Sequence, residues 1–183
     1  MTNNILLLHK FPFFCREELE SLPMNQPTFN IAKIVSESPS LQQMIDLGVD
    51  LSEWEEHDSN GKNIEIALRI NFEHDVKPRI QFMINQGVDL EYHANIFTSN
   101  PSIFDVSLES MNQSIEYLKS KNFSPRNIKD ILIGSYGRWF NYSLEIDKKL
   151  GYFQKNFELS GQEVRQIAVA APNLIIWSGV PYQ

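Results

Sequence analysis

Seven basic residues in the repeating part of the chain are the side chains best placed to do chemistry: Lys77, Arg79, Arg126, Lys129, Lys148, Lys149 and Arg165. Lys129 and Arg165 occupy equivalent places in successive repeats, and the basic pair at 77 and 79 has a counterpart in the lysines at 148–149. Equivalent positions of stacked repeats project from one side, so cations there can follow the phosphates of a nucleic-acid backbone. Lysine and arginine also cover the solvated face of ordinary helices, and that interpretation stays open.

Residue patterns that would support catalysis do not occur. The four histidines stand apart at positions 9, 57, 74 and 93, and none is near a cysteine cluster, so no metal site is expected. The chain has no phosphate-binding glycine loop and no nucleophile-elbow motif. Cys15 is the only cysteine, which excludes an intramolecular disulfide. We therefore expect a protein that is not an enzyme and has no cofactor.

Charge is distributed unevenly over the 183 residues, which carry a net charge of −7. Residues 1–104 have 7 basic against 15 acidic side chains, and residues 105–183 have 9 against 8. A surface for a polyanion is therefore expected in the later part of the chain. No apolar run approaches the roughly 18 residues that span a bilayer, so we expect no membrane partner.

The elements that must position these cations repeat about every 35 residues. Met111, Ile115 and Leu118 form an apolar stripe at helical spacing, and Ile146, Leu150 and Phe153 repeat such a stripe further on. Each stripe is followed by a second helical segment. A fixed period of this length predicts an all-α protein, an α-solenoid of helix pairs.

Boundaries inside each repeat can be placed from capping and breaking residues. Asp89, Ser124 and Ser160 are expected as N-caps of the second helices. Pro101 and Pro172 should end two of them, each before a short apolar tail of 3₁₀ type. In the middle repeat Tyr136 replaces the proline, so a softer break is expected there. The tail aromatics Phe104, Trp139 and Phe140 are interpreted as core between repeats in preference to base-stacking groups.

Residues 1–40 are expected to form an N-terminal tail and linker with little regular structure, because prolines are frequent after residue 22. An organelle-targeting segment and a poorly ordered N-terminus explain the acid-poor first 16 residues equally well. The repeat region is predicted over 41–183, with a divergent repeat at 41–71 and clear repeats at 72–105, 106–141 and 142–177.

Several stretches resemble the mitochondrial transcription termination factor (mTERF) family: DLGVDLSEWE (46–55), INFEHDV (70–76), YLKSKNFSPRNIKDIL (117–132) and LGYFQKNFELSGQEVRQIAVAAPNLI (150–175). The resemblance implies a left-handed superhelical solenoid of mTERF-like repeats in the mitochondrial matrix. It also implies binding of mitochondrial DNA or RNA, including double-stranded DNA, in the control of transcription, its termination, or ribosome biogenesis. Ribosome assembly proteins would then be further partners.

Two departures and one alternative qualify this expectation. The family usually carries more repeats, so the end at Gln183 suggests a truncated product, and the apolar residues Leu174, Ile175 and Trp177 would then favour self-association. Tyr136 departs from the family's proline. The alternative function is a helical-repeat scaffold for protein partners without nucleic-acid binding, which the acidic first half favours. Signatures of tetratricopeptide repeats and of base-reading RNA repeats do not occur.

Overall fold

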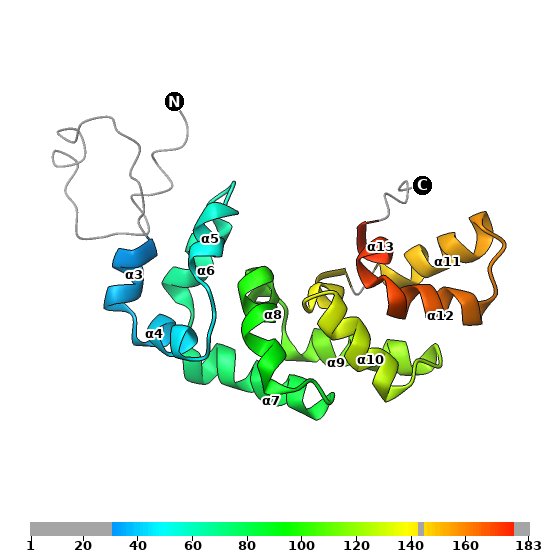
Figure 1. The fold of residues 1–183 in the computed structure, drawn as a ribbon, viewed down its shortest axis with the longest axis horizontal. Coiled ribbons are helices and arrows are strands. Elements are labelled where there is room, and N and C mark those ends of the chain that lie inside the picture. Colours follow the sequence, from blue (N-terminus) through cyan, green and yellow to red (C-terminus); the bar gives the residue numbers. More distant parts are fainter. Residues whose placement is uncertain (1–30, 143–144, 178–183) are drawn as a thin grey trace. The chain divides into compact units, whose positions relative to one another are not determined.

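A computed structural model describes residues 31–142 and 145–177, and in these ranges every regular element is a helix (Figure 1). This confirms the all-α prediction. The first part of the described chain contains α3 (Ile31–Glu37), α4 (Pro39–Asp46), α5 (Ser52–Glu56), α6 (Lys62–Arg69) and a turn of π-helix, η1 (Phe72–Val76). The expected targeting segment lies outside the described residues.

Helix α3 overturns part of the linker prediction. Residues 31–37 form this helix, and α4 starts at Pro39, where little regular structure was expected. Pro39 is in the first turn of α4, where a missing amide hydrogen costs nothing, and the Ser38 hydroxyl accepts a hydrogen bond from the Leu41 amide. Pro39 therefore marks the start of a helix and not a linker.

The later part of the chain is built from helix pairs, each followed by a short terminal helix. The first pair is α7 (Lys77–Asn85) and α8 (His93–Ser99), joined through the 3₁₀ turn η2 (Leu90–Tyr92) and followed by η3 (Pro101–Asp105). The second is α9 (Leu108–Ser120) and α10 (Pro125–Gly134), followed by η4 (Arg138–Tyr142). The third is α11 (Ile146–Asn156) and α12 (Gly161–Ala170), followed by α13 (Pro172–Trp177). We refer to these three groups as the first, middle and third units.

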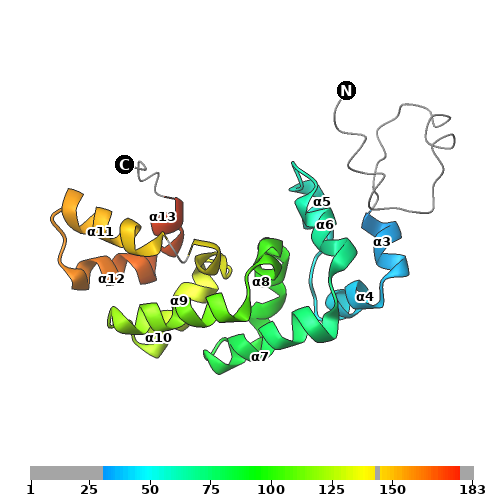
Figure 2. The ribbon, with the colours of Figure 1, turned by 180° about the vertical axis from the view of Figure 1, so that it is seen from behind.

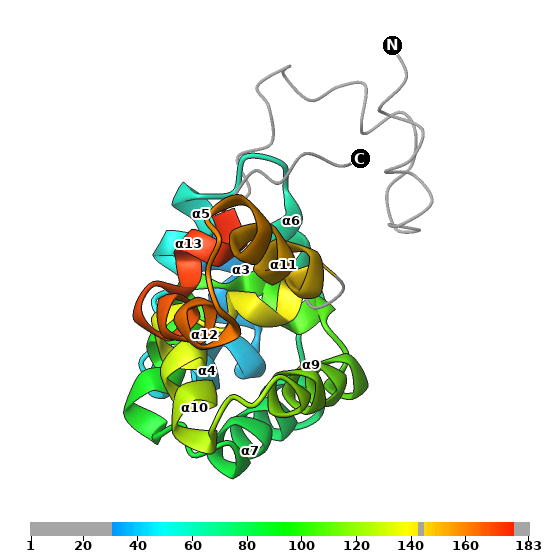
Figure 3. The ribbon, with the colours of Figure 1, turned by 90° about the vertical axis from the view of Figure 1, so that its right-hand side faces the viewer.

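Successive units pack layer on layer. Helix α10 packs against α12, and η3 packs against η4. Figure 3, which looks along the described units, places α10 and α12 on one side and α9 and α11 on the other. The reverse view in Figure 2 shows α9 passing in front of α10. Second helices thus form one layer and first helices another, as expected for a helical-repeat stack.

Capping explains where two of the second helices begin. Ser124 and Asn127 form a reciprocal capping box at the start of α10, and Ser160 and Glu163 form another at α12. Both predicted serine caps are confirmed. Asp89 occupies the N-cap position of η2, ahead of α8, but the expected capping bond does not form. Its carboxylate instead accepts a hydrogen bond of 2.6 Å from Lys129.

Breaks after the second helices differ from expectation in two places. Pro101 starts a 3₁₀ turn as predicted, but Pro172 starts α-helix α13. The middle unit turns sharply: α10 ends at Gly134, and Tyr136 and Gly137 have φ of +50° and +68°. A Cβ on Gly137 would lie 3.0 Å from Ile103 Cδ1, so glycine permits a close approach between two units.

The tail aromatics lie in the core, as interpreted. Phe104, Trp139 and Phe140 are almost fully buried. The ring centroids of Phe140 and Phe82 are 5.8 Å apart, and those of Phe104 and Phe97 are 5.1 Å apart. These rings hold units together and are not available to stack on bases. Among the described helices, none combines the length and the apolar character needed to cross a bilayer.

Candidate nucleic-acid interface

Arg79 is buried and binds backbone, so it cannot present its charge to a ligand. Its guanidinium donates hydrogen bonds to the carbonyls of Ile103 at 3.2 Å, Phe104 at 3.3 Å and Val106 at 2.6 Å, all at the tail of its own unit. It also donates to the carbonyl of Asp75 at 2.8 Å. Burial lowers the pKa of Arg79, although the group stays charged at neutral pH. We remove it from the set of phosphate contacts.

Lys149 repeats this arrangement in the third unit. It is 7% exposed, and its ammonium donates to the carbonyl of Ile176 in the tail. The same ammonium lies 5.3 Å from the centre of the Tyr142 ring. Like Arg79, Lys149 therefore stabilises the terminal helix of its own unit and does not present its charge to a ligand.

Lys77 and Lys129 are on the surface but are paired. Lys77 forms an ion pair with Glu73 at 2.8 Å, one turn earlier in the chain. Lys129 pairs with Asp89 and so ties α10 to the turn of the preceding unit. This pairing raises the pKa of Lys129 and lowers the pKa of Asp89 through their hydrogen bond. Exposed pairs of this kind contribute little stability, and phosphates can compete for their lysines.

Three candidates remain accessible. The Arg126 side chain is 90% exposed, with its Nε 3.9 Å from a carboxylate oxygen of Asp130. Lys148 is exposed and has no ion pair among the described residues. Arg165 is half-buried on α12, and within the described part of the chain its guanidinium makes one long hydrogen bond, 3.5 Å from Nη1 to the carbonyl of Lys121. The contacts of Arg126 and Arg165 are long, so these two cations and Lys148 can turn toward a ligand at little cost.

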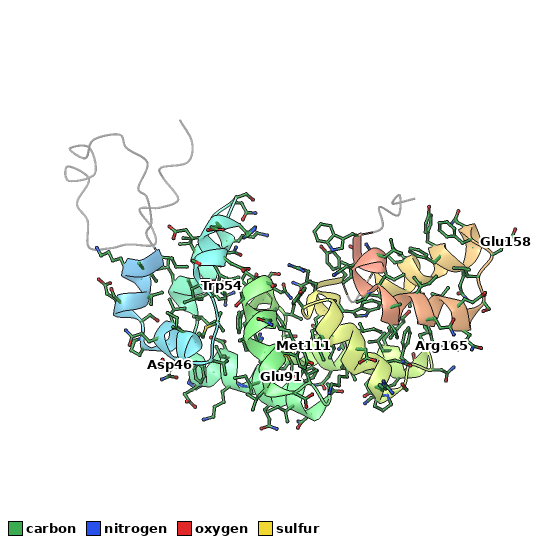
Figure 4. All side chains as sticks on the ribbon, viewed as in Figure 1. Asp46, Trp54, Glu91, Met111, Glu158 and Arg165 are labelled. Carbon is green, nitrogen blue, oxygen red and sulfur yellow. The ribbon has the colours of Figure 1, made fainter. Side chains whose placement is uncertain are left out.

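Arg165 lies in an open groove between the second helices α10 and α12, which we call the α10–α12 groove. Figure 4 shows Arg165 on the α12 side. The groove is lined by one cation, three side-chain amides and two small apolar residues: Arg165, Asn127, Gln162, Gln166, Val169 and Ala170. Guanidinium and amide donors together match phosphate and sugar oxygens, and Arg126 adjoins Asn127 on α10.

The capping box at the start of α12 limits the positive charge of this groove. Glu163 accepts hydrogen bonds from the hydroxyl and amide of Ser160, and these bonds lower the pKa of Glu163. The carboxylate is therefore ionised, and it occupies the helix start that would otherwise attract an anion. Binding must therefore rest on side-chain donors.

Sequence reasoning missed the amides of the groove. Gln162, Arg165, Gln166 and Val169 follow the helical spacing i, i+3, i+4 and i+7, which places them on one face of α12. This spacing was visible in the sequence. What the sequence did not show was that α10 closes the other side.

No group of acidic, histidine or cysteine side chains in the described residues is arranged to hold a metal ion. The buried His93 has its Nε2 3.2 Å from the carbonyl of Val88, and its Nδ1 finds no hydrogen-bond partner. It belongs to the core of the first unit.

Comparison with known proteins gives consistent matches. The family model described as mTERF matches residues 17–179. The mitochondrial transcription termination factor 3 of Drosophila melanogaster is 39% identical over 153 residues, which are 83% of this chain and 42% of that protein. The proteins of the same name from Rattus norvegicus and Mus musculus are 35% and 32% identical, over 81% and 80% of this chain and 35% of each relative. The chain thus spans about two fifths or less of the length of these relatives.

Proposed function

This chain belongs to the mTERF family, and on that premise we propose that it is a mitochondrial nucleic-acid-binding regulator that acts on transcription or ribosome biogenesis without catalysis. The observation that carries the proposal is the α10–α12 groove. There Arg165 and three side-chain amides line an open surface that a nucleic-acid backbone can reach. The names of the relatives, which are mitochondrial transcription termination factors, support the same assignment.

Phosphate contacts in this proposal come from fewer cations than the sequence offers. Arg126 and Arg165 flank the groove, Lys148 adds an unpaired charge on α11, and Lys77 and Lys129 join by exchanging carboxylates for phosphates. Arg79 and Lys149 contribute only by holding the units in shape. The ligand is a nucleic-acid backbone, because the donors are distributed over two units along an open groove.

Salt dependence tests this function. We expect the affinity of the whole chain for duplex DNA or structured RNA to fall steeply between about 50 and 200 mM salt. Arg165→Ala and Arg126→Ala should each weaken binding about three- to tenfold and lower the salt slope by about one. Lys33→Ala, in the acidic first part of the chain, is the matched control and should change neither quantity. Binding that is absent, or equal in all variants, would reject the proposal.

Location and partners follow from the same premise. We propose the mitochondrial matrix as the compartment, and mitochondrial DNA or RNA with ribosome assembly proteins as partners. Protease protection of the tagged chain in isolated, outer-membrane-stripped mitochondria tests the compartment. Crosslinking to nucleic acid, followed by sequencing of the bound fragments, distinguishes transcriptional from ribosomal targets.

Self-association through the third unit is a separate proposal. Leu174 and Trp177 are 53% and 73% exposed on α13, which leaves apolar area that a second copy can cover. Sedimentation velocity should show a concentration-dependent dimer that Trp177→Ser weakens. A chain that remains monomeric at every concentration would exclude it.

The protein-scaffold alternative is favoured by one observation, the acidic character of the first part of the chain. Residues 1–104 carry 15 acidic against 7 basic side chains, and such a surface repels nucleic acid. The two functions are compatible if they use different parts of the chain.

A further inference from the structure

An apolar groove lies at the start of the described chain, between α3 and the turn that joins α4 to α5. We call it the α3–α4 groove. Ile31, Val49 and Leu51 are buried beneath it, and Val35 and Ile45 form its accessible sides. The α3–α4 groove precedes the first unit in the sequence. It shares no residue with the α10–α12 groove, which the middle and third units form.

Ile45 is the exposed part of this apolar surface. It occupies the last turn of α4, and 47% of its side chain is accessible, while the preceding Met44 is completely buried. A lone exposed isoleucine is ordinary, but this one continues a groove whose base is aliphatic. Covering Ile45 and Val35 removes apolar surface from water and so favours a complex.

The segment that forms the groove is strongly acidic, and one of its carboxylates, Asp50, lines the groove itself. Residues 31–58 contain one basic side chain, Lys33, and seven acidic ones: Glu37, Asp46, Asp50, Glu53, Glu55, Glu56 and Asp58. None of the seven forms an ion pair with a lysine or arginine of the described chain. Hydrogen bonds from Ser52 lower the pKa of Asp50, so this carboxylate at the groove is ionised at neutral pH.

The C-terminus of α4 adds to the negative potential. Helix α4 ends at Asp46 and has no basic residue in its last turn, although a helix C-terminus favours cations. The arrangement costs stability in the free protein, and a cationic partner would relieve it.

We propose that the α3–α4 groove binds a basic amphipathic helix of a protein partner. Apolar side chains on one face of that helix fill the groove beside Ile45 and Val35. Lysines and arginines flanking this face meet Asp50, which lines the groove, and the carboxylates next to two other lining residues, Asp46 after Ile45 and Glu53 after Ser52 (Asp46 is labelled in Figure 4). Charge complementarity selects such a partner and rejects nucleic acid, which is itself a polyanion.

Peptide binding to the whole chain tests the proposal. The probe is a dye-labelled peptide of about 18 residues, made of leucine and lysine with the leucines on one helical face. A peptide of the same composition in scrambled order measures non-specific attraction, and one with glutamate in place of lysine tests the role of charge. We expect fluorescence anisotropy to show binding of the amphipathic peptide at least about tenfold tighter than either control.

Matched variants locate the binding surface. Ile45→Glu should weaken binding of the amphipathic peptide at least about tenfold, and Leu90→Glu, at an equally exposed leucine in η2, should leave it within about twofold. Asp46→Lys should weaken it about three- to tenfold, and Glu158→Lys, at the other end of the described chain, should not. Because all four side chains are exposed, thermal unfolding by circular dichroism should be nearly unchanged.

Several outcomes overturn the proposal. Absence of binding, equal binding of the scrambled peptide, or insensitivity to Ile45→Glu would each do so. If the wild-type chain is a dimer that Ile45→Glu dissociates, the occupant is a second copy. If peptide binds only after Leu6, Leu7 and Leu8 are replaced by serine, the occupant is the chain's own N-terminal segment.

Discussion

The first and third units of this protein bury a cation where the middle unit does not. Positions 79, 114 and 149 are separated by intervals of 35 residues and hold arginine, serine and lysine. Arg79 and Lys149 reach the tail carbonyls of their own units. Ser114 is equally buried, but its hydroxyl donates to the carbonyl of Ser110 within its own helix.

In the middle unit, the terminal turn η4 is held by hydrogen bonds to the preceding unit. Arg138 donates a hydrogen bond of 2.7 Å to the carbonyl of Ser99 in the first unit. Asn141 accepts a hydrogen bond from Asn100 and donates one to Ser102, also in the first unit. Polar groups of a buried tail need partners, and the stack supplies them either from within a unit or from its neighbour. The number of basic residues in a repeat is therefore no measure of its affinity for phosphate.

Removing the buried arginine should have the largest effect on this comparison. Arg79→Met leaves the carbonyls of Ile103, Phe104 and Val106 without their charged donor, and we expect the free energy of unfolding to fall by about 3 kcal/mol or more. Urea denaturation measures this change. Lys77→Met, two residues away in an exposed ion pair, should cost no more than about 0.5 kcal/mol. Equal losses would contradict the distinct roles of these neighbours.

A smaller loss is expected in the third unit. Lys149→Met removes the charged donor to the Ile176 carbonyl and should lower the free energy of unfolding by about 2 kcal/mol. The adjacent Lys148→Met is the control, and its effect on urea denaturation should be within about 0.5 kcal/mol. If Lys148→Met lowers the free energy of unfolding more than Lys149→Met does, then Lys148 is the structural lysine and our assignment is wrong.

The middle unit should respond to a different residue. Arg138→Met removes the bond to Ser99, and we expect a loss of about 1 kcal/mol in the free energy of unfolding, because the Asn141 bonds remain. The exposed Arg126→Met should be neutral in the same denaturation experiment. A loss for Arg138→Met as large as that for Arg79→Met would remove the distinction between the two ways of holding a tail.

The smallest expected effect is a dependence of stability on pH that only the first unit should show. At one equivalent core position of the second helices, the three units have His93, Ile128 and Val164. Burial lowers the pKa of His93, and the hydrogen bond to the Val88 carbonyl and the charge of Asp89 oppose this only in part. The unfolded chain then binds a proton more readily, so stability is complete above the ordinary pKa of about 6.5 and declines as pH falls below it. Between about pH 7 and pH 5.5 we expect this loss to be at most about 1 kcal/mol.

His93→Ile should flatten this dependence in urea denaturation repeated across the pH range. His57→Gln, at an exposed histidine, should not. An unchanged pH dependence in His93→Ile would show that other groups cause it.

Much of the fold was accessible from the sequence. The apolar stripes, the serine caps and Pro101 are local signals, and each acts within one or two helical turns. The burial of Arg79 was also encoded, because it lies three residues after Val76 and four before Met83 on the apolar face of the helix. Lys149 has the same relation to Ile146 and Phe153. The prediction failed where charge was given more weight than helical position.

The candidate sites depended on packing that no local pattern contains. Gln162 and Gln166 form a groove only because α10 lies alongside α12. Ile45 completes another groove only because residues 31–37 form a helix, which the adjacent prolines concealed. Contacts between elements decided both cases, and a single sequence reveals such contacts only through repeat spacing.

The buried cations also set the order in which the chain can fold. Arg79 finds its acceptors 24 to 27 residues later, and Lys149 finds its acceptor 27 residues later. During synthesis we expect each of these units to complete its buried hydrogen bonds only after its terminal helix has emerged. The middle unit, held by Arg138 to Ser99, docks on a neighbour that is already closed. We therefore expect the stack to form unit by unit during translation, in the direction of the chain.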